Sequence, residues 1–577
     1  MKYLLTGVIA LSLLTACGQK DKPSGEAALA AIEFDAGSLP NIRLRNGDPA
    51  TAADALAVFS LAESGSGRLT FDSRELNGDR AVFTNVILSI PEGAASEPAY
   101  SAEDIAEIFA YLDYDGDGIA DDGSGMTMEE YGAMLNEADP PAPPPVVKAG
   151  RLEFGGLGMI DGQANFSLMR LSDITLTPVA GSEDRSSGRV GKVELVNPSP
   201  ETAAWVASLF GEGEPADFPE GTALAFDRWL VSDVNVSMDD ASGTGLFTLD
   251  SMFISELGAE QAGKMGVSKL VFNFNDAGTG DVAINLDGFG VSGLNYGLIT
   301  AAMGGSDDPA FATMLQSDPG NPGFDAMQLK GLKADIVGAA IALPNFNSYV
   351  GRDNQGRATK ITTDPFTMTV AARDNPDGEQ FAGALAILGY ETLTLSAAGE
   401  QHYDPDADIL TLTKGKNYWK LDDGFKFDVA AKYEGTKALA AASATADTDP
   451  NAVIETMLNQ LAFHQLEFSF ADSGFFNRAL NAFAAQSGED PAQLRAQITG
   501  MMAMAPMFAG GTGIDTPVIT ELASAISSFV QDPKTLTIGI APQSPLTMQA
   551  FIDAAENPSD PSKKLDKTKL GFSAGNK

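Results

Sequence analysis

The sequence predicts an α+β protein built on an elongated, repetitive antiparallel β-sheet with short helices on one face. Alternation of apolar and polar residues, as at Val282, Ile284 and Leu286, is typical of half-buried antiparallel strands. A loose unit also recurs: a helix that opens at proline, then a Leu-x-Phe strand, as at 198–226 and 450–468. An inserted helix–loop–helix unit and a helical C-terminal region complete the predicted fold.

The composition indicates a folded, strongly acidic protein. Among 577 residues, 37 are basic and 78 acidic, which gives a formal net charge of −41, and 44% are hydrophobic. Such a charge repels nucleic acid and bare anionic lipid headgroups, so neither is an expected partner. The apolar content is sufficient for real cores, and the length allows two to four domains.

The N-terminus has the features of a secretory leader. Lys2 precedes an apolar stretch, residues 3–14, that is too short to span a bilayer. It ends in Leu14-Thr15-Ala16-Cys17, which resembles a bacterial lipobox. The resemblance implies cleavage before Cys17, lipidation of its sulfur and new amine, and a palmitate-type membrane anchor. Because Gly18 follows, rather than aspartate, it also implies the outer membrane, facing the periplasm or the cell surface.

The next elements are a helix and a hairpin. Asp48 and Pro49 are typical of a helix start, and we expect a helix to about Glu63. Strands are expected at 67–71 and 82–90, around a turn at Asn77 and Gly78.

Residues 101–135 carry the clearest chemical pattern in the chain. Asp113, Asp115 and Asp117 alternate, Gly118 follows them, and amphipathic helices are expected on both sides. A Ca²⁺ ion takes six to eight oxygen ligands, which a tight turn of alternating carboxylates can supply. Helix, acidic loop and helix together resemble an EF-hand, which implies calcium as the cofactor.

The loop departs from the standard twelve-residue pattern. If residues 120–125 are an insertion, Glu130 takes the closing position and Ile119 supplies a backbone carbonyl. In a second register, similar to thrombospondin-type calcium repeats, Asp121 or Asp122 closes the site. The alternative without calcium is a solvated acidic turn. A single stretched loop favours a structural brace over a sensor.

The remaining chain is expected to continue the repetitive sheet and then become helical. We expect strands at 150–154, 166–176, 224–226, 269–272 and 329–336, and helices at 198–210, 309–316 and 450–461. Further helices are expected at 475–485, 491–504, 517–530 and 545–555, with a strand at 536–540 and a flexible lysine-rich tail. Met501, Met502, Met504 and Met507 are expected on a buried helix face rather than in an apolar groove.

These elements divide the chain into seven expected segments. They are a leader at 1–16, a lipidated tether at 17–30, a first β element with a helix at 31–100, an EF-hand-like unit at 101–138, a proline-rich spacer at 139–149, a repetitive β-rich body at 150–440, and a helical α+β region at 450–577. A small, polar stretch at 438–449 marks the last boundary.

Catalytic patterns are missing from the sequence. Its two histidines, His402 and His464, lie on separate segments, and no Gly-x-Ser-x-Gly or His-Glu-x-x-His pattern occurs. We expect both to be structural, residues 403–408 to form a hairpin turn, and the basic stretch 414–426 to be a solvated sheet face. The protein is therefore not expected to be an enzyme.

The leading hypothesis is a non-enzymatic, calcium-binding lipoprotein of the cell envelope whose half-buried sheet binds an envelope protein or an apolar ligand. A second hypothesis is a lipid-handling protein, because long one-sided sheets with helices resemble envelope proteins of the AsmA kind. An apolar, concave sheet face would favour lipid handling, whereas a filled core would favour a scaffold. A third hypothesis is a hydrolase with carboxylates around His464.

Overall fold

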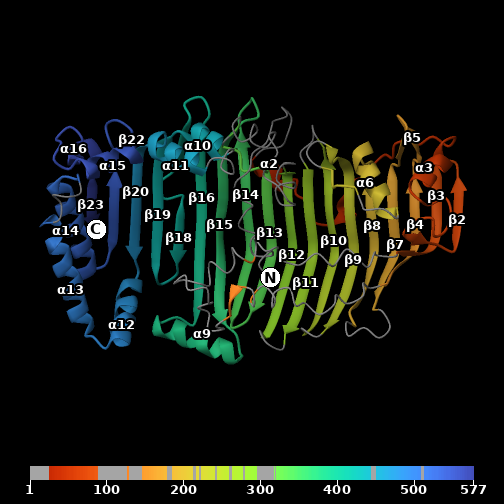
Figure 1. Ribbon diagram of the computed structural model, residues 1–577. Coiled ribbons are helices and arrows are strands. Elements are labelled where there is room, and N and C mark those ends of the chain that lie inside the picture. The colour runs from red at the N-terminus through yellow and green to blue at the C-terminus, as the bar shows by residue number, and fades with distance from the viewer. Residues whose placement is uncertain are drawn as a thin grey trace.

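The architecture is one long antiparallel meander, seen in a computed structural model (Figure 1). The structure describes residues 25–88, 105, 126–128, 131, 146–178, 185–211, 216–219, 223–240, 243–258, 263–276, 280–294, 318, 320–443, 450–507 and 513–577. Among these residues, 21 strands form a single sheet, and β5 (Gly158–Ile160) and β6 (Gln163–Asn165) form a separate hairpin. The predicted antiparallel sheet is confirmed.

The strands cross the sheet almost in chain order, because nearly every strand pairs with its neighbours in sequence. Their bounds are β1 Leu69–Thr70, β2 Ser73–Asn77, β3 Arg80–Leu88, β4 Val146–Gly155, β7 Leu168–Thr177, β8 Ser187–Val196, β9 Phe226–Asp240, β10 Gly243–Leu257, β11 Gly263–Asp276, β12 Gly280–Leu294, β13 Ala326–Ile336, β14 Ala339–Arg352, β15 Ala358–Ala372, β16 Thr392–Asp404, β17 Ile409–Leu412, β18 Tyr418–Leu421, β19 Phe425–Glu434, β20 Ala462–Asp472, β21 Thr535–Ile540, β22 Leu546–Thr547 and β23 Ser573–Asn576.

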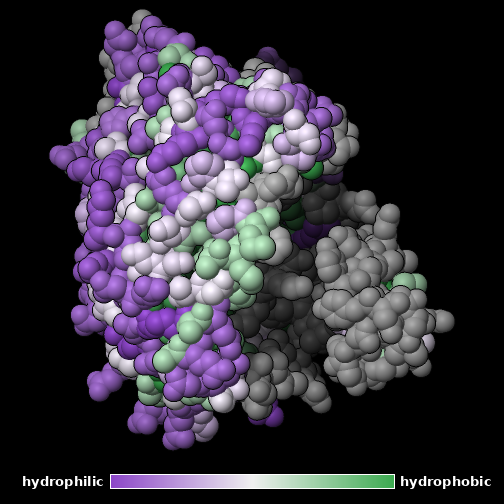
Figure 2. Space-filling model, turned by 90° about the vertical axis from the view of Figure 1, so that its left-hand side faces the viewer, coloured by the Kyte–Doolittle hydropathy of each residue, from purple (hydrophilic) through white to green (hydrophobic). Residues whose placement is uncertain are grey.

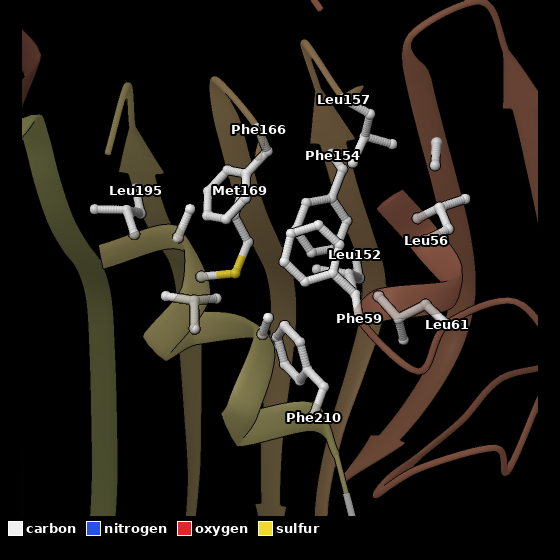
Figure 3. Packing of buried hydrophobic residues seen from close by; sticks show 14 of the residues in the cluster. Leu56, Phe59, Leu61, Leu152, Phe154, Leu157, Phe166, Met169, Leu195 and Phe210 are labelled. Atoms are coloured by element: carbon white, nitrogen blue, oxygen red, sulfur yellow. The ribbon is translucent and has the colours of Figure 1, made fainter. Parts of the chain in front are cut away.

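The largest core lies near the N-terminal end of the sheet, under α3 (Ala52–Val58) and α6 (Pro200–Phe210). Figure 3 shows Phe59 and Phe210 directed at Phe154 on β4, and the Phe59 and Phe154 rings stack at 5.5 Å between centroids. Helix α6 was predicted at 198–210 and begins two residues later, at Pro200, because the Ser199 hydroxyl accepts a hydrogen bond from the Thr202 amide and Pro200 fits the first turn.

The C-terminal part is rich in helices, as predicted. They are α9 Pro376–Ile387, α10 Thr436–Ser443, α11 Pro450–Asn459, α12 Phe475–Ser487, α13 Pro491–Met504, α14 Thr516–Gln531, α15 Met548–Glu556 and α16 Lys567–Leu570. Phe529 of α14 packs edge-on against Phe470 of β20, with the centroids 5.8 Å apart. This contact places α14 on one face of the last strands.

A segment that we name the strap, residues 25–47, runs along the sheet from β14 to β8. It includes α2 (Glu26–Ala30) and the 3₁₀ turn η2 (Ala36–Ser38). The Gly25 amide donates to the Val350 carbonyl oxygen at 2.8 Å, and the Arg45 amide donates to Asn197 Oδ1 at 3.1 Å. Gly288 and Gly290 of β12 leave room for the strap, since a Cβ on either would lie within 3 Å of a strap side chain.

A crease crosses ten adjacent strands, where ten residues lie opposite one another in a single row. They are Asn85, Gly150, Asp173, Gly191, Asp233, Asp250, Lys269, Asp287, Gly331 and Pro344. In every second strand the row residue has positive φ, from 47° at Lys269 to 64° at Gly331. Asn, Asp and Gly tolerate this conformation best, which explains their presence in mid-strand.

The crease reverses the alternation of side chains along each strand. On β7, Met169 and Ile174 are five positions apart, yet both enter the same core, because Asp173 with φ 54° lies between them. Without this residue, an odd separation would place them on opposite faces. The sheet therefore keeps one apolar face on both sides of the crease.

Several expectations need correction. The C-terminal tail is not flexible but forms β23, which pairs with β21. The sheet also continues across the expected boundary at 438–449, because β19 pairs with β20, and β4 begins at Val146, inside the expected spacer. Likewise, α2 lies within the expected tether, 17–30.

The methionines of α13 were also predicted wrongly. Met501, Met504 and Met507 are 56%, 49% and 80% exposed. Helix α13 buries none of its residues fully, and Arg495 ties it to α14 by donating to the Val530 carbonyl oxygen. Of the four methionines, only Met502 is half-buried.

Candidate apolar ligand-binding face

The residues predicted to hold calcium lie outside the described part of the chain. This applies to Asp113, Asp115, Asp117, Ile119, Asp121 and Glu130, to the lipidation site Cys17, and to the helix expected at 309–316. Among the described residues, no group of three or more His, Cys, Asp or Glu side chains is placed to hold a metal ion. In that same part of the chain, no helix is long and apolar enough to cross a membrane.

The two histidines are each paired with a glutamate on the sheet. His402 Nε2 lies 3.2 Å from Glu400, and His464 Nε2 lies 3.0 Å from Glu434. Near His402, residues 404–408 form the predicted turn between β16 and β17, in which Asp404 accepts hydrogen bonds from the amides of Asp406 and Ala407.

The feature with the clearest binding potential is one face of the central sheet, which we name the apolar face. It comprises three residues on each of eight consecutive strands, which the register places in three rows, with one irregularity in β15 beside Phe366. From β9 to β16 they are Val231, Val234, Val236, Phe247, Leu249, Met252, Val267, Leu270, Phe272, Ile284, Leu286, Phe289, Leu329, Leu332, Ala334, Ile341, Leu343, Phe346, Phe366, Met368, Val370, Leu393, Leu395 and Ala397. Each of these side chains is a hydrocarbon or a thioether.

Side-chain contacts confirm that the rows share one side of the sheet. Residues of β8 to β12 form a single hydrophobic cluster around Val234, Leu249 and Val267. Farther along, the rings of Phe346 and Phe366 meet edge-on at 5.2 Å between centroids. Most residues of the apolar face are only partly buried, so they still meet solvent.

The described helices cover the two ends of this side but not its middle. Helices α3 and α6 pack near β3 to β8, and α14 packs beyond β20. Helix α9 reaches only the last strands of the face, where Leu385 clusters with Leu393 and Leu395. The cluster of β8 to β12 contains strand residues alone. Among the described residues, helices therefore cover the two ends of the apolar face and leave its middle without a helix.

The opposite face of the sheet is polar. Asn235, Asn273 and Asn285 lie there, opposite Phe272 and its neighbours, as do the strap and a buried ion-pair triad. In that triad the Glu194 carboxylate, only 1% exposed, binds Arg170 at 2.6 Å and Arg228 at 2.7 Å. Burial alone would raise the pKa of Glu194, but the two guanidinium groups overcome this and lower it. Figure 2 shows the C-terminal end of the molecule with one side almost wholly hydrophilic.

A second buried ionic cluster closes the strand ends at β13 to β15. Arg352 donates to Asp325 at 2.6 Å and lies 3.7 Å from Asp318. Burial raises the pKa of Asp318, although the Ala358 amide and the Arg352 charge oppose the shift. These groups satisfy one another, so they leave no free polar group to react with a ligand.

Sequence reasoning detected individual strands of the apolar face, such as Val282 to Leu286, but not the face itself. Because the crease reverses the alternation, the pattern of the strands from β9 to β14 breaks at a mid-strand Asp, Gly, Lys or Pro. A recurring Asp, Asn or Gly in the middle of apolar alternation was the available signal.

Comparison with known proteins adds one match. A family model described as "Uncharacterized protein" matches residues 418–575, which span β18 to β23. No curated protein matches the chain, and no solved structure matches it.

Proposed function

We propose that the protein is a non-enzymatic lipoprotein of the bacterial envelope that binds lipid acyl chains along the apolar face. The observation that carries the proposal is the chemistry of that face: 24 aligned side chains without a charge or a hydrogen-bonding group, in a chain of net charge −41. A surface so large and so apolar marks a binding site in a soluble protein.

The same chemistry favours lipid over a protein partner. Protein interfaces carry about one hydrogen bond per 100–200 Å², together with a polar rim. The apolar face offers no side-chain donor or acceptor across β9 to β16, and its backbone groups are used in strand pairing. An acyl chain needs neither, and it gains about 0.8 kcal/mol for each CH₂ group that it buries.

Anchoring and calcium complete the proposal on sequence grounds. Cys17 would carry the membrane anchor, in an outer-membrane lipoprotein facing the periplasm or the cell surface. Calcium at Asp113, Asp115 and Asp117, closed by Glu130 or Asp121 and a carbonyl oxygen of Ile119, would brace the inserted helix pair. The proposal thus combines the lipoprotein hypothesis with the AsmA-like, lipid-handling hypothesis.

The test compares two substitutions on opposite faces of one strand, Phe272→Gln and Val271→Gln. Lipid bound without a covalent link is extracted from each purified protein with organic solvent and measured by mass spectrometry; lipid on Cys17 stays with the precipitate. Phe272→Gln is expected to lower the affinity about 15-fold, and with it the amount of lipid recovered, because losing contact with about two CH₂ groups costs about 1.6 kcal/mol. Val271→Gln should leave it unchanged. Wild-type protein without extractable lipid, or equal loss in both variants, would contradict the proposal.

A further inference from the structure

We propose that the sheet stands upright on the membrane, with the strand ends near Gly25 toward the bilayer. These ends, which we name the anchor edge, are Leu294 of β12, Val350–Arg352 of β14 and the turn at 353–357 that leads into β15. The far edge lies at the opposite strand ends. It comprises Ile336 of β13, Ala339 of β14 and Ala372 of β15, together with α9. The inference rests on the proposed lipid anchor at Cys17 and adds to it an orientation.

The chain enters the described fold at a fixed point. The Gly25 amide donates to the Val350 carbonyl oxygen at 2.8 Å, and Ala28 is fully buried. The Ser292 hydroxyl donates to the Ala28 carbonyl oxygen at 3.4 Å, and farther along the strap the Lys330 ammonium lies 4.3 Å from the centre of the Phe34 ring. Gly25 is thus attached to the anchor edge and cannot slide toward the far edge.

Chain length then decides which edge a lipid on Cys17 can bring to the membrane. Gly25 follows Cys17 by eight residues, which span at most about 27 Å when fully extended. Strand β15 has 15 residues and is about 50 Å long, so the far edge lies beyond the reach of this tether.

The two faces of the sheet argue against its lying flat. On the apolar side, α6 and α14 stand at opposite ends, and each is about 10 Å thick, so a flat bilayer would meet them first. The polar side carries the strap and the exposed ion pairs of the crease, such as Asp173–Arg189 and Asp250–Lys269, and moving charged groups from water into a bilayer costs free energy.

Exposed apolar side chains are present along the same border as Gly25. Ile454 and Met457 of α11 are 57% and 45% exposed. Figure 1 shows α10, α11 and α15 along the same edge of the sheet, the upper one in this view, as α2. Such side chains can enter the headgroup region. Ile387 of α9, at the far edge, is also 66% exposed, so exposure alone would not select an edge. The tether length does.

The test places one fluorescent label at each edge of the full-length, lipidated protein. Gln355, in the turn of the anchor edge, and Gln380, on α9, are both exposed, and either can be replaced by cysteine. Cys17 is the only natural cysteine, and lipidation blocks its sulfur, so the dye reacts at the new site. The proteins are inserted into phosphatidylethanolamine and phosphatidylglycerol vesicles that contain an acceptor-labelled lipid.

Energy transfer from Gln355→Cys to the bilayer is expected to exceed that from Gln380→Cys at least about twofold, because about 50 Å of strand separates the two labels. Equal transfer, or greater transfer from Gln380→Cys, would overturn the orientation. Flotation of unlabelled wild-type protein with the vesicles separates the two causes of failure. If it floats while transfer is equal, only the orientation is wrong; if it does not float, the anchor is wrong and the orientation falls with it.

Discussion

The crease makes a quantitative prediction at Gly191. In β8 this glycine lies opposite Asp233, whose φ is 55°, and a Cβ at position 191 would lie 2.6 Å from the Asp233 Cβ. Gly191→Ala therefore forces two backbones apart, and overpacking of this kind costs about 1–3 kcal/mol.

The contact can be relieved from the other side. Asp233→Gly removes the opposing Cβ. In the wild-type background it should leave the free energy of unfolding nearly unchanged, because relief of about 1 kcal/mol of backbone strain at positive φ is offset by a similar entropic cost of ordering glycine. In Gly191→Ala it should recover most of the loss, so the two substitutions couple strongly. Gly575→Ala is the matched control, because a Cβ at this strand glycine meets nothing within 4 Å.

Amide hydrogen exchange, followed by mass spectrometry on peptides from β8 and β9, reports the local opening energy. A loss of about 2 kcal/mol raises the exchange rate about 30-fold when strands open and close rapidly. Gly191→Ala should show this increase, the double variant should show little of it, and Gly575→Ala should show none in β21 and β23. Wild-type exchange in Gly191→Ala, or no recovery in the double variant, would refute the account of the crease.

Two further predictions concern buried charge and calcium. Glu194→Gln should destabilise the protein by about 3 kcal/mol at pH 7, because Arg170 and Arg228 lose a buried partner. Since folding lowers the pKa of Glu194, the wild-type advantage is present above the ordinary glutamate pKa and disappears as pH falls through the lowered value; urea titrations at several pH values would show whether the two proteins converge in acid. Asp113→Ala/Asp117→Ala should abolish saturable Ca²⁺ binding near one ion per chain, measured by calorimetry, and a wild-type protein that gives no heat at millimolar Ca²⁺ would refute the calcium loop.

Local features of the fold could be predicted from the sequence, and they are mostly those that short-range chemistry determines. The prolines that open the helices predicted α6 and α13, for which the structure adds Ser199 and Asp490 as N-caps. The turn at Asn77 and Gly78 precedes β3 as expected, but the strand before it is β2, Ser73–Asn77, rather than the expected 67–71. The antiparallel meander followed from alternation within single strands.

The apolar face could not be predicted because it depends on the registers of many strands at once. Asp233 and Lys269 are poor strand formers, and their positive φ has meaning only when the row across neighbouring strands is seen. The tail was misjudged for a similar reason: its lysines suggested solvent, whereas β23 is stabilised by pairing with β21. The exposure of Met504 likewise depends on how α13 meets α14, which a helical pattern does not specify.

The chain-order meander has a consequence for how such a protein folds and changes in length. Because strands such as β9, β10, β11 and β12 pair with their immediate successors, most loop closures are short, and folding can start at any hairpin and spread outward. Each hairpin contacts mainly its two neighbours, as repeats do in solenoid proteins. A pair of strands could therefore be gained or lost in the interior without rearranging the others, and the apolar face could be lengthened in steps of about 10 Å.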